Sequence, residues 1–61
     1  MTDSEILQSH KMYVRNNCDR ITIAQHFGIH PEQLSSIWVN NTVLDLKNRM
    51  SEEQFNKIYR S

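Results

Sequence analysis

The side chains that could carry out catalysis or bind a metal include one cysteine and three histidines, namely Cys18, His10, His26 and His30. A zinc site needs several ligands that converge on one point, and these spacings fit no tetrahedral pattern. His26 and His30 are four residues apart, but Gly28 lies between them and breaks the helix, so they do not share a helical face. We therefore expect no metal site and no cofactor.

Catalytic machinery is not indicated either. Cys18 has no neighbouring base or pocket of the kind that activates a nucleophile. A chain of 61 residues is too short to wall a deep cleft, and its one glycine excludes a glycine-rich phosphate loop. We expect that the protein is not an enzyme.

A second group of polar side chains, between residues 30 and 40, is suited to hydrogen bonding. It comprises His30, Glu32, Gln33, Ser35, Ser36 and Asn40. Asn and Gln form paired hydrogen bonds with adenine, Ser bonds to several bases, and Glu accepts from cytosine. The segment contains no Lys or Arg, so the common contact of arginine with guanine is missing.

Residues that favour helix ends divide the chain into five short helices. Capping boxes, in which two side chains satisfy free backbone amides, are indicated at residues 2–5, 42–45 and 51–54. Asp19 is suited to cap a second helix, and Pro31 to the first turn of a third. We predict an all-α fold, a compact bundle of about five short helices in one domain over residues 1–61.

Apolar residues at helical spacing predict the buried faces. In the first helix the expected stripe is Ile6, Leu7, His10, Tyr13 and Val14, with Met12 outside it. In the later helices the expected inward residues are Ile23, Ala24, Phe27, Leu34, Ile37, Trp38, Val43, Leu46, Met50, Phe55, Ile58 and Tyr59.

Residues 20–39 have the pattern of a helix-turn-helix, two helices that cross at a wide angle through a short turn. Ala24 is small where the second helix of the pair has to pack closely, and Gly28 permits the positive φ that the turn needs. Five apolar residues are expected to fill the corner between the helices, namely Ile23, Phe27, Ile29, Leu34 and Ile37.

This segment resembles the helix-turn-helix of bacterial and phage transcription regulators. All seven pattern positions agree: Ile23, Ala24, Phe27, Gly28, Ile29, Leu34 and Ile37. Residues 23–31 with Leu34 and Ser35 also look like the first such motif of AraC-type activators, a likeness that ends after Trp38. The size is similar to that of Cro-like phage repressors, which are small five-helix proteins.

The resemblance implies that residues 31–40 form a recognition helix in the major groove of double-stranded DNA. The candidate DNA-binding residues are Arg20, Thr22, His30, Glu32, Gln33, Ser35, Ser36, Asn40, Lys47 and Arg49. His30 is a weaker helix cap than Ser or Asp; either it is tolerated there or it contacts a phosphate or base, and we favour the contact. We expect a sequence-specific regulator, such as a phage- or plasmid-type repressor, acting as a homodimer.

The charge of the chain opposes this interpretation, because seven basic residues are balanced by seven acidic ones. DNA binding depends strongly on cations, so Arg20, Lys47 and Arg49 would have to share a positive face with the third helix. If acidic residues dominate that face instead, the alternative is a protein-interaction module that binds a regulator or polymerase subunit and uses the helix-turn-helix only as scaffold.

Composition also bears on location. The single cysteine cannot form an internal disulfide, which is typical of a reducing compartment. No apolar run approaches the ~18 residues of a membrane span, and the polar N-terminus does not look like a secretory signal. We expect a cytoplasmic protein with no membrane contact.

Overall fold

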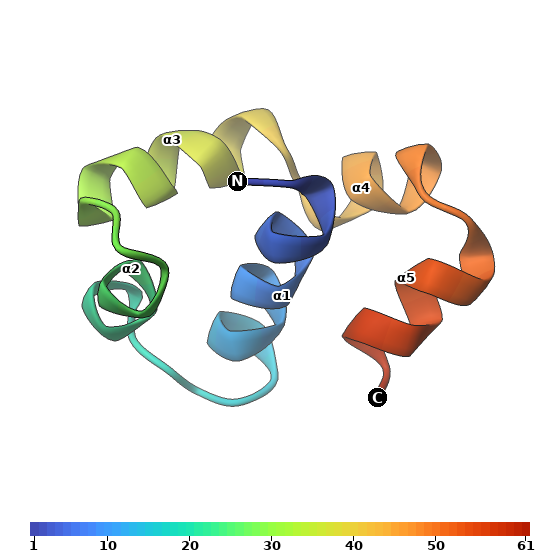
Figure 1. Cartoon of the computed structure of the whole chain (residues 1–61), viewed down its shortest axis with the longest axis horizontal. Coiled ribbons are helices and arrows are strands. Elements are labelled where there is room, and N and C mark those ends of the chain that lie inside the picture. Colours follow the sequence, from blue (N-terminus) through green and yellow to red (C-terminus); the bar gives the residue numbers. More distant parts are fainter.

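Each helix of this protein begins at a side chain that accepts a hydrogen bond from a free backbone amide. In a computed structural model, which describes all residues 1–61, these caps are Thr2, Asp19, His30, Thr42 and Ser51. The helices are α1 Asp3–Val14, α2 Arg20–Phe27, α3 Pro31–Asn40, α4 Val43–Arg49 and α5 Glu52–Tyr59 (Figure 1). The prediction of an all-α bundle of five short helices is confirmed.

Two of the three predicted capping boxes are complete, those at residues 2–5 and 42–45. At the third, the Ser51 side chain accepts from the Gln54 amide at 3.2 Å, but the return bond is absent. The Gln54 side chain instead donates to Ser4 Oγ at 3.2 Å. The prediction of a full box was wrong here because Gln54 ties α5 to α1.

Helix α1 is the centre of the packing and contacts all four other helices. Figure 1 shows it between the α2–α3 pair on one side and α4 and α5 on the other. Two small clusters of buried residues lie on these two sides. The first consists of Ile6, Leu7, Leu46 and Phe55, and the second, between α2 and α3, of Ile23, Ala24 and Leu34.

The predicted stripe of α1 is therefore wrong at its C-terminal end. Tyr13 and Val14 are 51% and 58% exposed, whereas Met12, expected outside the stripe, packs on the cluster between α2 and α3. The physical reason is that α1 contributes residues to two clusters on different sides, with Ile6 and Leu7 in the first and Met12 packed on the second. Its buried surface is therefore broader than one stripe.

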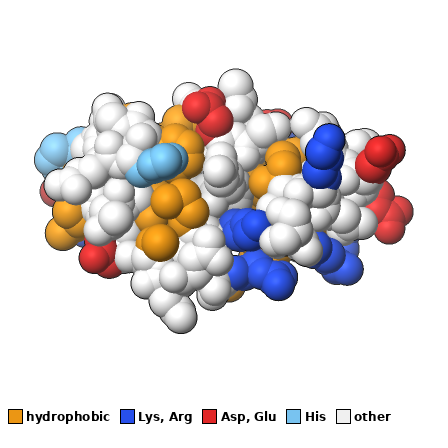
Figure 2. Space-filling view, turned by 60° about the horizontal axis from the view of Figure 1, so that its bottom comes forward, with side chains coloured by type: hydrophobic (Ala, Val, Ile, Leu, Met, Phe, Trp, Pro, Cys, Tyr) orange, Lys and Arg blue, Asp and Glu red, His pale blue; other side chains and the backbone are white.

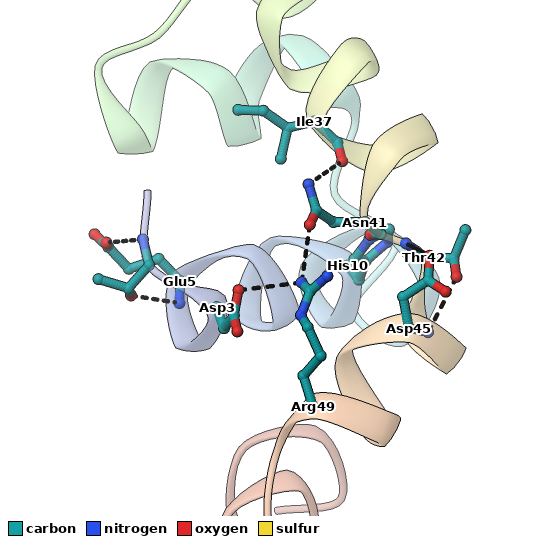
Figure 3. A network of polar contacts seen from close by, with 9 residues as sticks. Asp3, Glu5, His10, Ile37, Asn41, Thr42, Asp45 and Arg49 are labelled. Carbon is teal, nitrogen blue, oxygen red and sulfur yellow. Dashed lines mark hydrogen bonds and ion pairs between the residues drawn. The ribbon is translucent and has the colours of Figure 1, made fainter.

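A hydrogen bond between α1 and α3 was not predicted. Ser9 is fully buried, accepts a hydrogen bond from Trp38 Nε1 at 2.9 Å and donates to the carbonyl of Ile6. His10, one residue further, stacks on the Trp38 ring with centroids 5.3 Å apart. Its Nε2 donates to the carbonyl oxygen of Asn41 at 2.7 Å, close to the end of α3 (Figure 3). These contacts fix α3 against α1.

The protonation of His10 gives the first testable prediction. Burial lowers the pKa of His10 below its ordinary value of 6.5, and the hydrogen bond to Asn41 only partly opposes this effect. The unfolded chain therefore binds a proton at higher pH than the folded one, so the free energy of unfolding rises with pH in this window. We expect stability to be constant above about pH 7.5, to fall as the pH drops through 6.5, and to level off below the folded pKa.

Urea denaturation at a series of pH values measures this effect. The variant His10→Gln is the comparison, because it has no titratable side chain at position 10. Cap hydrogen bonds lower the pKa values of Glu5 and Asp19, and their loss on protonation is confined to more acidic conditions. If the wild type and His10→Gln lose stability equally between pH 7.5 and 5, His10 does not have the assigned role.

Candidate nucleic-acid interface

Helices α2 and α3 are joined by a short turn of residues 28–30, which begins at the predicted glycine. Gly28 lies in the left-handed region with φ 69° and ψ 33°, and its amide donates to the carbonyl of Gln25 at 3.1 Å. The amide of Ile29 donates to the carbonyl of Ala24 at 3.0 Å, so the last carbonyls of α2 are satisfied as the chain turns. The predicted positive φ of Gly28 is confirmed.

Most of the predicted corner residues are in place. Ala24 is fully buried beside Ile23 and Leu34, and Phe27 and Ile29 pack around them. Ile37 was predicted to fill the corner but packs on the α1–α4–α5 cluster instead, because it lies one turn nearer to α4 than Leu34 does. Trp38 packs on the corner cluster in its place.

The outer face of α3 is polar and open to solvent. Its exposed residues are Glu32, Gln33, Ser36, Val39 and Asn40. Ser35 was predicted to belong to the same face, but it is partly buried and its Oγ accepts a hydrogen bond from Arg20 Nη1 at 2.6 Å. At about 100° per residue, Ser35 is turned toward α2 rather than outward. Among the exposed polar residues of this face, the side chains of Glu32, Ser36 and Asn40 form no hydrogen bond within the chain.

The first turn of α3 uses two of the candidate residues in its own cap. His30 Nδ1 accepts from the amide of Glu32 at 3.2 Å, and Gln33 Oε1 accepts from the amide of His30 at 3.0 Å. His30 thus functions as a cap, with its Nδ1 unprotonated and its other ring nitrogen free of the cap. Gln33 has to release its cap before it can form a paired bond to adenine.

The candidate cations do not converge. Arg20 reaches α3, but Lys47 and Arg49 lie on opposite sides of α4, because residues two apart on a helix are separated by about 200°. Arg49 donates to Asp3 Oδ1 at 3.1 Å and to Asn41 Oδ1 at 2.8 Å (Figure 3). Lys47 Nζ lies 5.9 Å from the centroid of the Phe55 ring. The condition that these three cations share one positive face with α3 is therefore not met, which favours the alternative of a protein-interaction module.

The start of α2 carries charges of both signs. Asp19 Oδ1 accepts from the amide of Thr22 at 2.7 Å, and this hydrogen bond lowers the pKa of Asp19. The carboxylate thus occupies the helix N-terminus at which a phosphate could bind. Thr22 itself is exposed on the first turn of α2. Arg20 is therefore a single cation that directly follows the acidic cap Asp19.

Sequence reasoning missed two hollows that flank the C-terminal end of α1. The first, of about 470 Å³, is lined by Tyr13, Arg20, Ser35, Trp38 and Val39. The second lies between α1, α4 and α5 and is lined partly by Arg15 and Arg60. The only signals in the sequence were apolar residues such as Val39 that fall outside the buried face of their helix.

Comparison with models of protein families, with curated proteins and with solved structures finds no match for this chain. None of the five helices has the length and apolar character needed to cross a membrane. No three side chains of His, Cys, Asp or Glu lie together as a metal site requires.

The turn at Gly28 gives the second prediction. A Cβ at this position would meet no atom within 4 Å, so a substitution costs only backbone strain. We expect Gly28→Val to lower the free energy of unfolding by about 1–2 kcal/mol, and Gly28→Asn to lower it less, because Asn tolerates the left-handed region. Urea denaturation measures both variants. Equal losses for Val and Asn, or none for Val, would contradict the assigned φ.

Proposed function

We propose that this protein binds double-stranded DNA through α2 and α3 and acts as a sequence-specific transcriptional regulator of the repressor type. The observation that carries the proposal is the α2–α3 corner, in which the left-handed Gly28 and the buried Ala24 leave the outer face of α3 polar and uncovered. A ten-residue helix exposed in this way fits the major groove, which admits a single α-helix.

In this proposal α3 lies along the major groove, with its exposed polar face at the base edges from the first turn to the last residue. Ser36 and Asn40 are the base-reading residues, and Gln33 joins them when it releases its cap on His30. Arg20 is held by Ser35 at the start of α2, from which its guanidinium contacts a backbone phosphate. Each cation that meets a phosphate releases counterions and fixes the register of the complex.

The charges predict a weak dependence of binding on salt. One phosphate contact contributes a slope of about −0.9 to a plot of log affinity against log salt concentration. Arg49 also reaches the C-terminal end of α3, but it is paired with Asp3. With Arg20 as the one cation beside α3 that has no carboxylate partner, we expect a slope of about −1 for each protomer. Such a small electrostatic contribution favours a homodimer that binds two half-sites, because paired sites are the usual source of useful specificity for this motif.

A second candidate function is a protein-interaction module in which the helix-turn-helix is only scaffold. The observation that favours it is the composition of the α3 face, where Glu32 is the only charged residue among those exposed and no cation is present. A surface of this kind is better suited to contact with protein than with phosphate.

Fluorescence anisotropy with random-sequence duplex DNA across a salt series tests the proposed function. The preferred site is then selected from the random sequences. We expect binding at low salt with the shallow slope given above. The double variant Ser36→Ala with Asn40→Ala should bind the selected site about tenfold or more weakly, with unchanged helix content by circular dichroism.

The matched control is Gln8→Ala with Asn48→Ala, two exposed polar residues on α1 and α4. We expect this control to bind the selected site as the wild type does. Equal binding by both double variants would contradict the assigned base-reading residues. The absence of binding at any salt concentration would contradict DNA binding and leave the protein-interaction function.

A further inference from the structure

A groove of about 740 Å³ lies between the C-terminal end of α1 and helices α4 and α5. Its apolar lining consists of Val43, Leu44, Phe55 and Tyr59. Leu44 is 66% exposed and forms an uncovered apolar edge, whereas the Phe55 ring lies in the buried cluster beneath. Together with the partly exposed Val43 and Tyr59, Leu44 forms a continuous apolar surface in the groove, and continuous exposed apolar surface is typical of interaction sites.

Three cations and no carboxylate complete the lining of this groove: Arg15, Lys47 and Arg60. The guanidinium carbon of Arg15 lies 5.9 Å from the centroid of the Tyr59 ring, and Lys47 is at the same distance from the Phe55 ring. These contacts hold the two cations over the aromatic rings without neutralising them.

The acidic residues of the chain do not compensate this charge. The only salt bridge of the structure joins Arg49 and Asp3, so none of the three groove cations has a carboxylate partner. Figure 2, which brings forward the lower side of Figure 1 where α1 and α5 end, shows Lys and Arg side chains gathered beside exposed hydrophobic ones. A chain with zero net charge thus has a locally positive, partly apolar surface.

The combination of an apolar centre and a rim of one charge sign selects among possible occupants. A second copy bound symmetrically would bring the same patch against itself, so that Arg15, Lys47 and Arg60 of each copy would repel one another. A nucleic-acid backbone would neutralise the cations but would leave Leu44 and Val43 uncovered. A helix with apolar side chains on one face and carboxylates beside them matches both parts of the groove.

We propose that this groove is a docking site for an acidic amphipathic helix of a partner protein, with Leu44 and Tyr59 contacting its apolar face and Arg15, Lys47 and Arg60 binding its carboxylates. The groove is formed by α1, α4 and α5 and the proposed DNA contacts by α2 and α3, so both can be occupied at once. This inference does not depend on the proposed DNA binding.

The fourth prediction uses a fluorescein-labelled helical peptide as the probe, with leucines on one face and glutamates on both sides of them. Anisotropy should show binding that weakens with added salt, and little binding of the same peptide with lysine in place of glutamate. We expect Lys47→Glu to weaken binding about tenfold, because it places a like charge against the peptide.

Lys57→Glu is the matched control. Lys57, like Lys47, is an exposed cation in the last turn of a short helix, but it lines a different hollow. Both variants change the net charge and the helix-end electrostatics equally, so we expect Lys57→Glu to bind the peptide within about twofold of the wild type. For the apolar part, Leu44→Ser should weaken binding and Ile21→Ser, an exposed apolar position on α2, should not.

Three results would overturn the proposal. The first is no binding of the glutamate peptide, or equal binding of its lysine counterpart. The second is an equal loss for Lys47→Glu and Lys57→Glu, which would mean that only net charge matters. The third is that Lys47→Glu weakens binding to duplex DNA and not to the peptide, which would make the groove part of a phosphate-binding surface.

Discussion

The hydrogen bond from the Trp38 indole to the buried Ser9 hydroxyl fixes the orientation of α3 in this structure. Only eight residues of the chain are buried: seven form two small clusters on different sides of α1, and the eighth is Ser9. Neither cluster would be large enough to position α3 unaided. The polar bond, together with the stacking of His10 on Trp38, makes α1 a common support for both clusters and for the helix-turn-helix.

Local features of the fold were predictable from the sequence because each depends on a few neighbouring residues. Thr2 and Asp19 cap their helices because the first backbone amides of a helix need an acceptor. The turn at Gly28 was predictable because its positive φ favours glycine. Features that depend on two distant segments were not predictable. The burial of Ser9 depends on its hydrogen bond with Trp38, which lies 29 residues further along the chain. The packing of Ile37 on the α1–α4–α5 cluster likewise depends on where α4 and α5 lie, which local spacing does not reveal.

The candidate site was predictable to a similar extent. The bounds of α3 were predicted from the sequence, but the partners of its side chains are tertiary or capping contacts that spacing does not reveal. Ser35 is bound by Arg20, and Gln33 is used in the cap of His30. Of the seven Lys and Arg residues, one lies at the start of α2 beside α3 and three line the groove of α1, α4 and α5. A neutral chain thereby presents two surfaces of different character: the polar face of α3 and the positive, partly apolar groove of α1, α4 and α5.

The central claim is that α3 and the start of α2 form the DNA-binding surface. Nuclear magnetic resonance titration of the ¹⁵N-labelled protein with duplex DNA at low salt tests it most directly. We expect the largest changes in amide chemical shift at Arg20 and in α3 around Ser36 and Asn40. The amide chemical shifts of Leu44 and Tyr59 should remain unchanged. Shifts confined to the groove residues, or no shifts at all, would contradict it.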